Sequence, residues 1–439
     1  MNIIIAGAGR VGYELARLLS LHHSVTVIDR NAKALQRLQE SIDILPVEGD
    51  IEDPDTYKRF IDKESDLFIA VTDNDEANLL STLIADDAIE LSRKFIRLRN
   101  PNFAKTKVCD RLGIDEAFYP MELTSEAVAI LLRYPHANNV KRFEYTDNVL
   151  ISLRVTVDSS IDIPKSDNYI VVGVERDKSL FIPTDDMMLQ QNDLVYLFGQ
   201  EVAIRQKCKE LDVLSPSEIE RSIIFGADEL GVSIAKALIK EDIEVKIIEK
   251  SLELCHIADE KLGGSAMTLS CKYGTATLFE EEGLSHANMA IAATEDDEYN
   301  IVKCLEAREH GIEKVMAVNN EIEYYNVMHS LGIVVIRGPK INALNAIIEK
   351  INSSHVITER KFCGGKGQIY LRRVFSTSHL VGKKLKLPKK IDDIIFILIR
   401  DGSLIRLESE PLFIEEGDII VLFTTSNEAN RVHEWIHGL

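Results

Sequence analysis

The sequence lacks the features that define several large classes of protein. Its six cysteines are scattered without a CxxC pair, so it predicts neither a disulfide framework nor a cysteine-based zinc site. No stretch reaches roughly 18 uncharged apolar residues, so we expect no membrane-spanning helix. The first strand-like run follows Met1 directly, without a basic leader, which predicts a cytoplasmic chain with no signal peptide.

Positive charge is also scarce. The 439 residues include 51 Lys and Arg against 71 Asp and Glu, a formal net charge of -20. This acidity excludes the electrostatic footprint of a nucleic-acid binder, and no basic segment is present for a DNA-binding redox sensor. One basic patch, KKLKLPKK at 383–390, could face anionic lipid or an acidic partner, but a solvated loop is the simpler interpretation.

The sequence does contain a dinucleotide fingerprint at its start. Residues 2–6 predict a strand, GAGRVG follows, and an apolar helical pattern begins there. Gly7 permits a tight turn, Gly9 leaves space for a phosphate, and Gly12 lets the helix pack close to the strand. Free backbone amides and the positive end of the helix dipole then attract an anion. The nucleotide-binding candidates in this loop are Gly7, Ala8, Gly9, Arg10, Val11 and Gly12.

A second signal supports the first. The next predicted strand ends in Asp29, about 20 residues downstream, where a ribose-binding acid belongs. Its carboxylate would accept hydrogen bonds from both ribose hydroxyls and repel the extra phosphate of NADP. The alternative, a strand–helix turn that binds nothing, does not explain this agreement. Further candidates at predicted strand ends are Asp50, Thr72, Asp73 and Arg97, the last as a bidentate phosphate ligand.

An internal repeat determines the predicted architecture. SIIFGADELGVSIAKALI, starting at Ser222, repeats the strand, glycine turn and helix, and later landmarks recur at offsets between 219 and 225. The repeat extends into runs of alternating polarity separated by turn residues, which are typical of short strands. The predicted units are a Rossmann-like domain at 1–120, a linking helix at 121–140, a small strand-rich domain at 141–213, a second Rossmann-like domain at 222–339, a second linking helix at 340–358 and a second small domain at 359–439.

The two copies differ where a phosphate would bind. In the second copy, Asp228 replaces Gly9, Glu229 replaces Arg10, Thr275 replaces Asp50, and Ala317 replaces Arg97. Two acids beside a phosphate cost on the order of 1 kcal/mol each in a solvated cleft. We therefore expect the second cleft to bind nucleotide weakly or not at all, with Gly226 and Glu249 its remaining candidates.

No catalytic or metal-binding constellation stands out. The acidic runs TDNDEAN (72–78) and TEDDEYN (294–300) are better interpreted as helix N-termini than as cation sites. The scattered histidines, for example His136, His256, His286 and His310, form no ligand spacing, and we predict no metal. An NAD-dependent oxidoreductase is the alternative function, but it would need a substrate domain with a general base near the nicotinamide, and each Rossmann-like unit is followed only by short strands.

These patterns together resemble the TrkA family, the peripheral subunits of Trk potassium uptake systems, which carry two RCK (or KTN) regulatory domains. The resemblance covers essentially the whole chain and rests on its tandem order. Its motifs are GAGRVG (7–12), VIDR (27–30), GD (49–50), AVTDNDEAN (70–78) and Arg97.

The resemblance implies an α/β fold with two Rossmann-like parallel-sheet domains, each followed by a small α+β domain of the RCK C-terminal type. It implies a regulatory subunit and not an enzyme. Such subunits form a cytoplasmic ring, expected here to be a homotetramer, docked under an integral membrane potassium channel-like subunit of the TrkH/TrkG type. NAD(H), ATP or ADP in the Rossmann clefts would change the shape of the ring and gate the pore.

Overall fold

The structure is a computed structural model and describes residues 1–60, 64–143, 145–157, 161–164, 166–184, 186–216, 218–271, 276–353, 356–385, 393–406 and 412–439. Part of the basic patch at 383–390, and Thr275, lie outside these residues.

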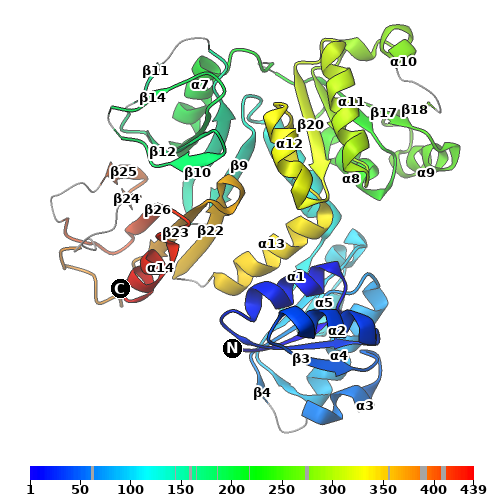
Figure 1. Cartoon of the computed structure of the whole chain (residues 1–439), viewed down its shortest axis with the longest axis vertical. Helices are drawn as coiled ribbons and strands as arrows, with labels where there is room; N and C mark the ends of the chain where they lie inside the picture. The colour runs from blue at the N-terminus through cyan, green and yellow to red at the C-terminus, as the bar shows by residue number, and fades with distance from the viewer. Residues whose placement is uncertain are drawn as a thin grey trace.

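The first Rossmann-like domain is a six-stranded parallel sheet, in agreement with the predicted fold (Figure 1). The strand order is β3-β2-β1-β5-β7-β8, so the chain reverses direction across the sheet next to β1. Its strands are β1 (Asn2–Ala6), β2 (Ser24–Asp29), β3 (Leu45–Glu48), β5 (Leu67–Ala70), β7 (Lys94–Arg97) and β8 (Glu116–Phe118), and a short pair, β4 (Glu64–Ser65) and β6 (Glu90–Leu91), lies beside them. Its helices are α1 (Arg10–Leu19), α2 (Ala32–Ser41), α3 (Pro54–Tyr57), α4 (Asp75–Ala88) and α5 (Val108–Arg111).

The second Rossmann-like domain repeats this topology with the order β18-β17-β16-β19-β20-β21. Its strands are β16 (Arg221–Phe225), β17 (Glu244–Glu249), β18 (Met267–Ser270), β19 (Met289–Ala292), β20 (Lys314–Asn319) and β21 (Val334–Arg337). Its helices are α8 (Glu229–Ile239), α9 (Leu252–Leu262), α10 (Ala276–Glu281), α11 (Asp297–Glu309) and α12 (Tyr325–Ser330). The central strands β16, β19 and β20 are buried on both faces, as apolar runs without alternation require.

Each small domain is an antiparallel five-stranded sheet with one helix after its last long strand. The first contains β9 (Asn139–Phe143), β10 (Thr146–Arg154), β12 (Tyr169–Arg176), β13 (Ser179–Phe181), β15 (Leu194–Gln200) and α7 (Glu201–Leu211), with a short pair β11 (Ile161–Asp162) and β14 (Met188–Leu189). The second contains β22 (Ile357–Phe362), β23 (Gly367–Arg373), β24 (Ile394–Arg400), β25 (Ser403–Arg406), β26 (Ile419–Thr425) and α14 (Ala429–His437). Bidentate pairs Arg176–Asp193 and Arg400–Asp418 occupy the same place in the two domains.

The linking helices exchange partners between the two halves. Helix α6 (Pro120–Ala129) follows the first Rossmann-like domain but packs on α8 of the second. Helix α13 (Pro339–Asn352) follows the second domain and packs on α1 of the first, burying Ile347 and Ile351 there (Figure 1). The two linking helices also touch each other, where Asn342 donates to the hydroxyl of Thr124 at 2.9 Å. Each linking helix therefore packs on the Rossmann-like domain of the other half, within one chain.

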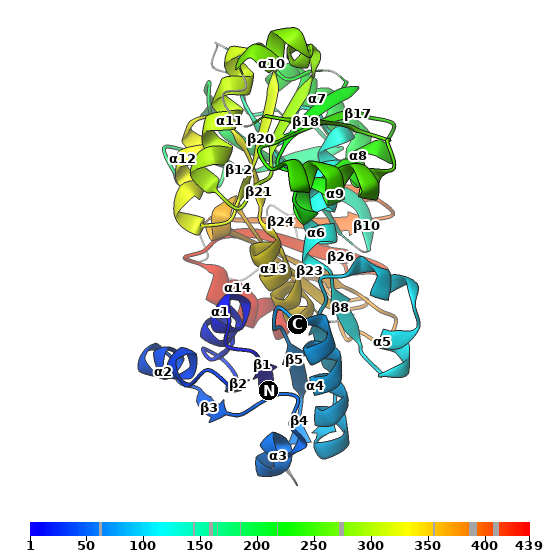
Figure 2. The same ribbon diagram turned by 90° about the vertical axis from the view of Figure 1, so that its right-hand side faces the viewer.

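The two small sheets pack face to face. Aromatic side chains from both fill the interface, with Phe198 and Phe423 at a ring-centroid distance of 5.1 Å and Tyr196 and Phe362 at the same distance. Figure 2 shows the second Rossmann-like domain at one end, the first at the other, and the linking helices with the small sheets between them. Among the described residues, no helix is long and apolar enough to cross a membrane.

Candidate nucleotide-binding site

The glycine loop at residues 7–12 joins β1 to α1 as predicted. Gly7 has a φ of 112°, a value that L side chains rarely adopt. A Cβ atom on Gly12 would lie 1.9 Å from the Gly7 carbonyl oxygen, so only glycine fits this contact between helix and turn. A Cβ atom on Gly9, in contrast, would meet no atom within 4 Å. The loop therefore leaves open space beside the first amides of α1, where a phosphate would sit.

Asp29 lies at the carboxyl end of β2 and points toward this loop. Its Oδ2 accepts from the Ala8 amide at 2.6 Å, and its Oδ1 accepts from the Asn31 amide at 2.7 Å. The carboxylate thus holds the loop and the start of α2 together, while the side chain stays partly exposed. The structure brings Asp29 and the glycine loop together, which is what a ribose–phosphate ligand requires.

The other strand-end candidates have partners of their own. Arg97 is 5 % exposed and donates to Asp73 Oδ1 at 2.8 Å and to the Thr72 carbonyl at 3.3 Å. Burial would raise the pKa of Asp73, but the hydrogen bond and charge of Arg97 outweigh it, and the pKa lies below its usual value. Arg97 therefore holds the Asp73 loop at the rim of the cleft through Nη1. Its role as a phosphate ligand stays a prediction.

Asn78 organises the rest of this rim. Its side chain accepts from the amide and hydroxyl of Thr72 and donates to the Thr72 and Arg97 carbonyls, all within 3.0 Å. Asp50 lies at the end of β3, exposed, with its carboxylate accepting from the Glu52 amide at 3.0 Å. The acidic run at 72–78 starts α4 as expected, although the capping side chain is Asn74, which accepts from the Ala77 amide.

The second cleft keeps the backbone and loses the open space. Asp228 stands where Gly9 does, and its Oδ1 accepts from the Gly231 amide at 3.0 Å. Burial first, and the nearby Glu295 and Glu249 next, raise the pKa of Asp228 despite its hydrogen bonds to backbone amides. The Asp228 carboxylate occupies the position where an anion would bind. The negative charges of Glu295 and Glu249, which help to raise its pKa, would also repel a phosphate.

The ribose side of the second cleft is retained. Glu249 Oε2 accepts from the Ala227 amide at 2.9 Å, which repeats the Asp29 contact. A cavity of about 140 Å³ lies beside it, lined by Gly226, Ile248, Glu249, Lys250, Thr294, Asp296 and Tyr299. Gly226 and Glu249 thus lie together, as the sequence predicted, but next to a filled phosphate position.

One correspondence drawn from the sequence is wrong by one residue. Asn78 donates to the Arg97 carbonyl at 2.9 Å, and its counterpart Asn300 donates to Val318 at 3.0 Å. Val318, and not Ala317, is therefore the structural equivalent of Arg97. The guanidinium is absent from the second cleft in either alignment.

The two glycine loops face each other's domains, which sequence inspection missed. Arg10 pairs with Glu321 of the second domain, with nitrogen–oxygen distances of 2.6 and 2.7 Å, and donates to the Asn320 carbonyl. Glu229, the counterpart of Arg10, pairs with Arg99 of the first domain at 3.1 Å. The first loop thus supplies the cation of its pair and the second loop supplies the anion. The partner of Glu229 lies far away in the sequence, so no local pattern could indicate it.

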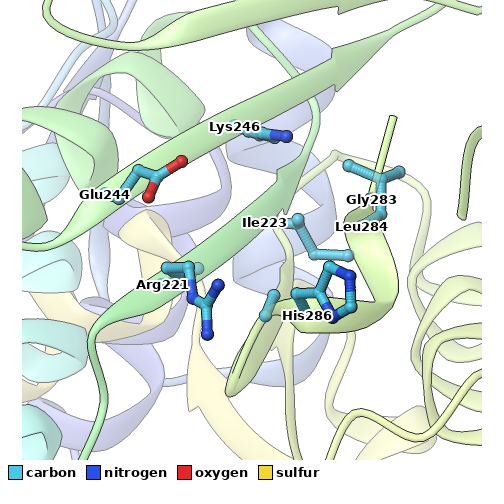
Figure 3. Close-up of a pocket in the computed structure, with 9 residues that line it drawn as sticks. Arg221, Ile223, Glu244, Lys246, Gly283, Leu284 and His286 are labelled. Carbon is cyan, nitrogen blue, oxygen red and sulfur yellow. The ribbon is translucent and has the colours of Figure 1, made fainter. Parts of the chain in front are cut away.

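A further cavity of about 150 Å³ lies at the opposite edge of the second sheet (Figure 3). Arg221 and Glu244 begin β16 and β17, so this hollow is at the amino ends of the strands, away from the glycine loop. Lys246 at its wall donates to the Glu282 carbonyl at 2.7 Å. Ligands of open α/β sheets bind at the carboxyl ends, so this cavity is not the nucleotide site.

The fold and site define a tandem Rossmann-like protein with one open glycine loop and one glycine loop filled by a carboxylate. The model of the TrkA-N domain matches residues 3–120 and 222–339, more than half of the chain. The chain therefore belongs to the TrkA-N domain family, and the predicted tandem membership is confirmed.

Curated relatives match over nearly the full length. A Trk system potassium uptake protein TrkA homolog from Archaeoglobus fulgidus is 28% identical, covering 99% of each chain. A Trk system potassium uptake protein TrkA from Azorhizobium caulinodans is 24% identical, covering 99% of this chain and 98% of that one. The names of these relatives are those of potassium uptake proteins and not of enzymes.

Solved structures agree on the fold. The GsuK RCK domain superposes with a TM-score of 0.60 at 17% identity, covering 100% of this chain and 95% of that one. The GsuK channel bound to NAD gives the same TM-score at 17% identity, covering 100% of this chain and 79% of that one. The predicted pairing of Rossmann-like and small domains is therefore the RCK fold.

Proposed function

We propose that the chain is the regulatory subunit of a potassium uptake system and that NAD(H), ATP or ADP binds in the first Rossmann cleft. The observation that carries this proposal is the open space at Gly9 beside Asp29, an anion position and a ribose acceptor in one cleft. The names of the relatives, and GsuK structures described as bound to NAD and to ADP, support it.

The output of nucleotide binding is a change in how the two halves meet. A phosphate at Gly9 would lie next to Arg10, whose guanidinium is engaged by Glu321 across the domain boundary. Both side chains are about half exposed, at 41% and 50%, so their pairing is worth little and is open to competition. A ligand that binds one arrangement of Arg10 better than the other shifts the equilibrium between them by that difference in affinity.

The chain carries this change to a membrane partner. The proposal includes self-association into a ring, a homotetramer, on the cytoplasmic face of the membrane under a potassium-translocating subunit of the TrkH/TrkG type. Helix α13 contacts α1 of the first Rossmann-like domain, the other linking helix α6, and β22 of the second small domain, and these contacts are the path by which a shift at Arg10 leaves the first cleft.

Nucleotide titration of the purified full chain tests the site. We expect Asp29→Ala to weaken binding of NADH, ATP or ADP at least about tenfold, because a charged hydrogen bond to the ribose is lost. Glu249→Ala is the matched control, since it removes the same loop contact in the second copy. Equal affinities in the wild type and Asp29→Ala would remove Asp29 from the site.

Potassium flux tests the output. The chain and the TrkH/TrkG-type subunit are reconstituted together in liposomes, and flux is measured with and without each nucleotide. We expect a nucleotide-dependent change that Asp29→Ala abolishes. Flux that responds equally in wild type and variant, or turnover of NADH with a substrate, would contradict a regulatory role.

A further inference from the structure

Three potential metal ligands converge at the edge of the second small domain. Glu359 lies on β22, and His433 and His437 lie on α14. Glu359 Oε1 lies 2.9 Å from His433 Nδ1 and 2.7 Å from His437 Nε2. All three ligand atoms lie within 4.8 Å of one another. Neither the family nor the nucleotide site accounts for this cluster.

The spacing of these residues suits a metal ion. Two histidines four residues apart lie on one face of a helix, and the strand supplies the third donor from the side. Zinc binds imidazole nitrogen and carboxylate oxygen at about 2.0 to 2.2 Å, which places tetrahedral ligand atoms about 3.3 Å apart. The two oxygen–nitrogen distances, 2.9 and 2.7 Å, need to lengthen by only about half an ångström to match this separation.

The supporting structure holds the donors in place without an ion. The Tyr370 hydroxyl donates to the Ala429 carbonyl at 3.0 Å, and Arg372 donates to the Ile436 carbonyl at 2.6 Å. These bonds attach both ends of α14 to β23, and Val432 and Ile436 pack beneath the helix. Each backbone position is therefore set before a ligand arrives, which lowers the cost of binding.

The burial of the donors separates this cluster from ordinary surface contacts. Glu359 is 7% exposed, whereas the side chains of His433 and His437 are 51% and 42% exposed. A carboxylate removed from water needs a compensating charge or hydrogen bonds. Here both imidazoles lie against the same carboxylate oxygen, Glu359 Oε1. The exposed imidazoles leave a route from solvent and a fourth position for water, as in zinc sites with three protein ligands.

The first small domain has no equivalent of this cluster. In the matching strand pair, Val140 lies opposite Ile151 where Glu359 lies opposite Tyr370. Helix α7, the counterpart of α14, carries no histidine. The cluster is therefore a property of the second copy alone and not of the repeated fold.

We propose that Glu359, His433 and His437 bind one divalent transition metal ion, with Zn²⁺ the ion of best fit and water completing the coordination. The ion would attach α14 to β22 and stabilise the second small domain, because a ligand that binds only the folded state adds to its stability.

Metal binding by the full chain, free of any polyhistidine tag and stripped with chelator, tests this site. We expect one Zn²⁺ per chain by competition with a zinc indicator and a rise in the thermal midpoint on zinc addition. Co²⁺ should give the visible absorption of a tetrahedral site. The double variant His433→Gln/His437→Gln should lose more than about tenfold in affinity, together with the cobalt spectrum, since even indirect supports of a metal contribute that much.

Matched controls separate this site from other binding. His256→Gln removes an exposed histidine from α9 and should change nothing. Glu359→Gln keeps the shape of the side chain and should lose zinc affinity while remaining folded by circular dichroism. Zinc affinity or a cobalt spectrum in the double variant equal to those of the wild type, or a stoichiometry well below one, would overturn the proposal.

Discussion

The two Rossmann clefts have nearly the same backbone and opposite chemistry. Gly9 has φ and ψ of -66° and -175°, and Asp228 has -68° and -172°. Gly7 and Gly226 share φ values of 112° and 113°. One loop leaves its helix N-terminus open, and the other fills it with its own carboxylate. One side chain, on an unchanged backbone, therefore decides whether the amides at the start of the helix are open to a ligand or capped within the chain.

The largest expected effect comes from transferring that side chain. Gly9→Asp should fold, because the position is open and its backbone already matches that of Asp228. The new carboxylate would accept a hydrogen bond from the Gly12 amide and repel a phosphate. We expect the two effects together to weaken nucleotide binding on the order of 100-fold. Titration with NADH, ATP and ADP measures this, and unchanged affinity would contradict the assigned phosphate position.

The same background isolates the second cleft. Any nucleotide binding that remains in Gly9→Asp belongs to the second copy and is expected to be weaker than micromolar. Adding Asp228→Gly opens that loop and should restore at least about tenfold in affinity, since a competing charge leaves. Helix α8 loses the side-chain cap that Asp228 provides, but we expect this to lower the stability of the protein by only a few tenths of a kcal/mol. No recovery would mean that Asp228 is not what excludes the phosphate.

The second prediction concerns how the halves are packed. Lys314 of the second Rossmann-like domain is buried and donates to the Pro135 and Ala137 carbonyls, which lie in the segment between α6 and β9. Its counterpart Arg93 instead lies over Phe95 of its own domain, at 5.4 Å from the ring centroid. Burial lowers the pKa of Lys314 from 10.5 to about 8, against the attraction of Asp212.

This pKa makes stability depend on pH. The folded state binds fewer protons than the unfolded state between pH 8 and 10.5, so the free energy of unfolding rises with pH in that window. The slope is at most about 1.4 kcal/mol per pH unit. Denaturant unfolding of the wild type minus Lys314→Met, measured from pH 7 to 10, should show this rise. A flat difference would mean that Lys314 titrates normally.

The smallest expected effect lies at the boundary between the clefts. Glu321→Gln releases Arg10 and should raise nucleotide affinity a few-fold, because the exposed pair contributes at most about 1 kcal/mol. High salt should reduce the difference. The control is Glu241→Gln, which breaks the Arg133–Glu241 pair of similar exposure and should leave affinity unchanged. An equal change in nucleotide affinity in both variants would show that Arg10 does not take part in nucleotide binding.

Features that depend on residues close together in the sequence could be predicted from it. The β1–loop–α1 unit, the position of Asp29 and the replacement of Gly9 by Asp228 are local patterns, and the structure places each as expected. The parallel sheet of each Rossmann-like domain could be predicted because a helical pattern separates each predicted strand from the next. The assignment of nucleotide-binding residues and the domain boundaries remain predictions.

Contacts between distant segments could not be predicted in this way. The partner of Glu229 is Arg99, and that of Arg10 is Glu321, because the halves meet across their loops. The sequence also showed no sign of the pairing between Arg97 and Asp73. His433 and His437 show helical spacing in the sequence, but their common partner Glu359 lies on a strand far upstream.

The exchanged linking helices also have a consequence for synthesis of the chain. Helix α6 ends at Ala129 and its partner α8 begins at Glu229, so the ribosome adds about 100 residues before the two can meet. At about 5 to 20 residues per second this takes roughly 5 to 20 seconds. Val128 and Leu131 have no α8 to pack on during that time, and the nascent first half exposes an apolar surface that a chaperone could shield.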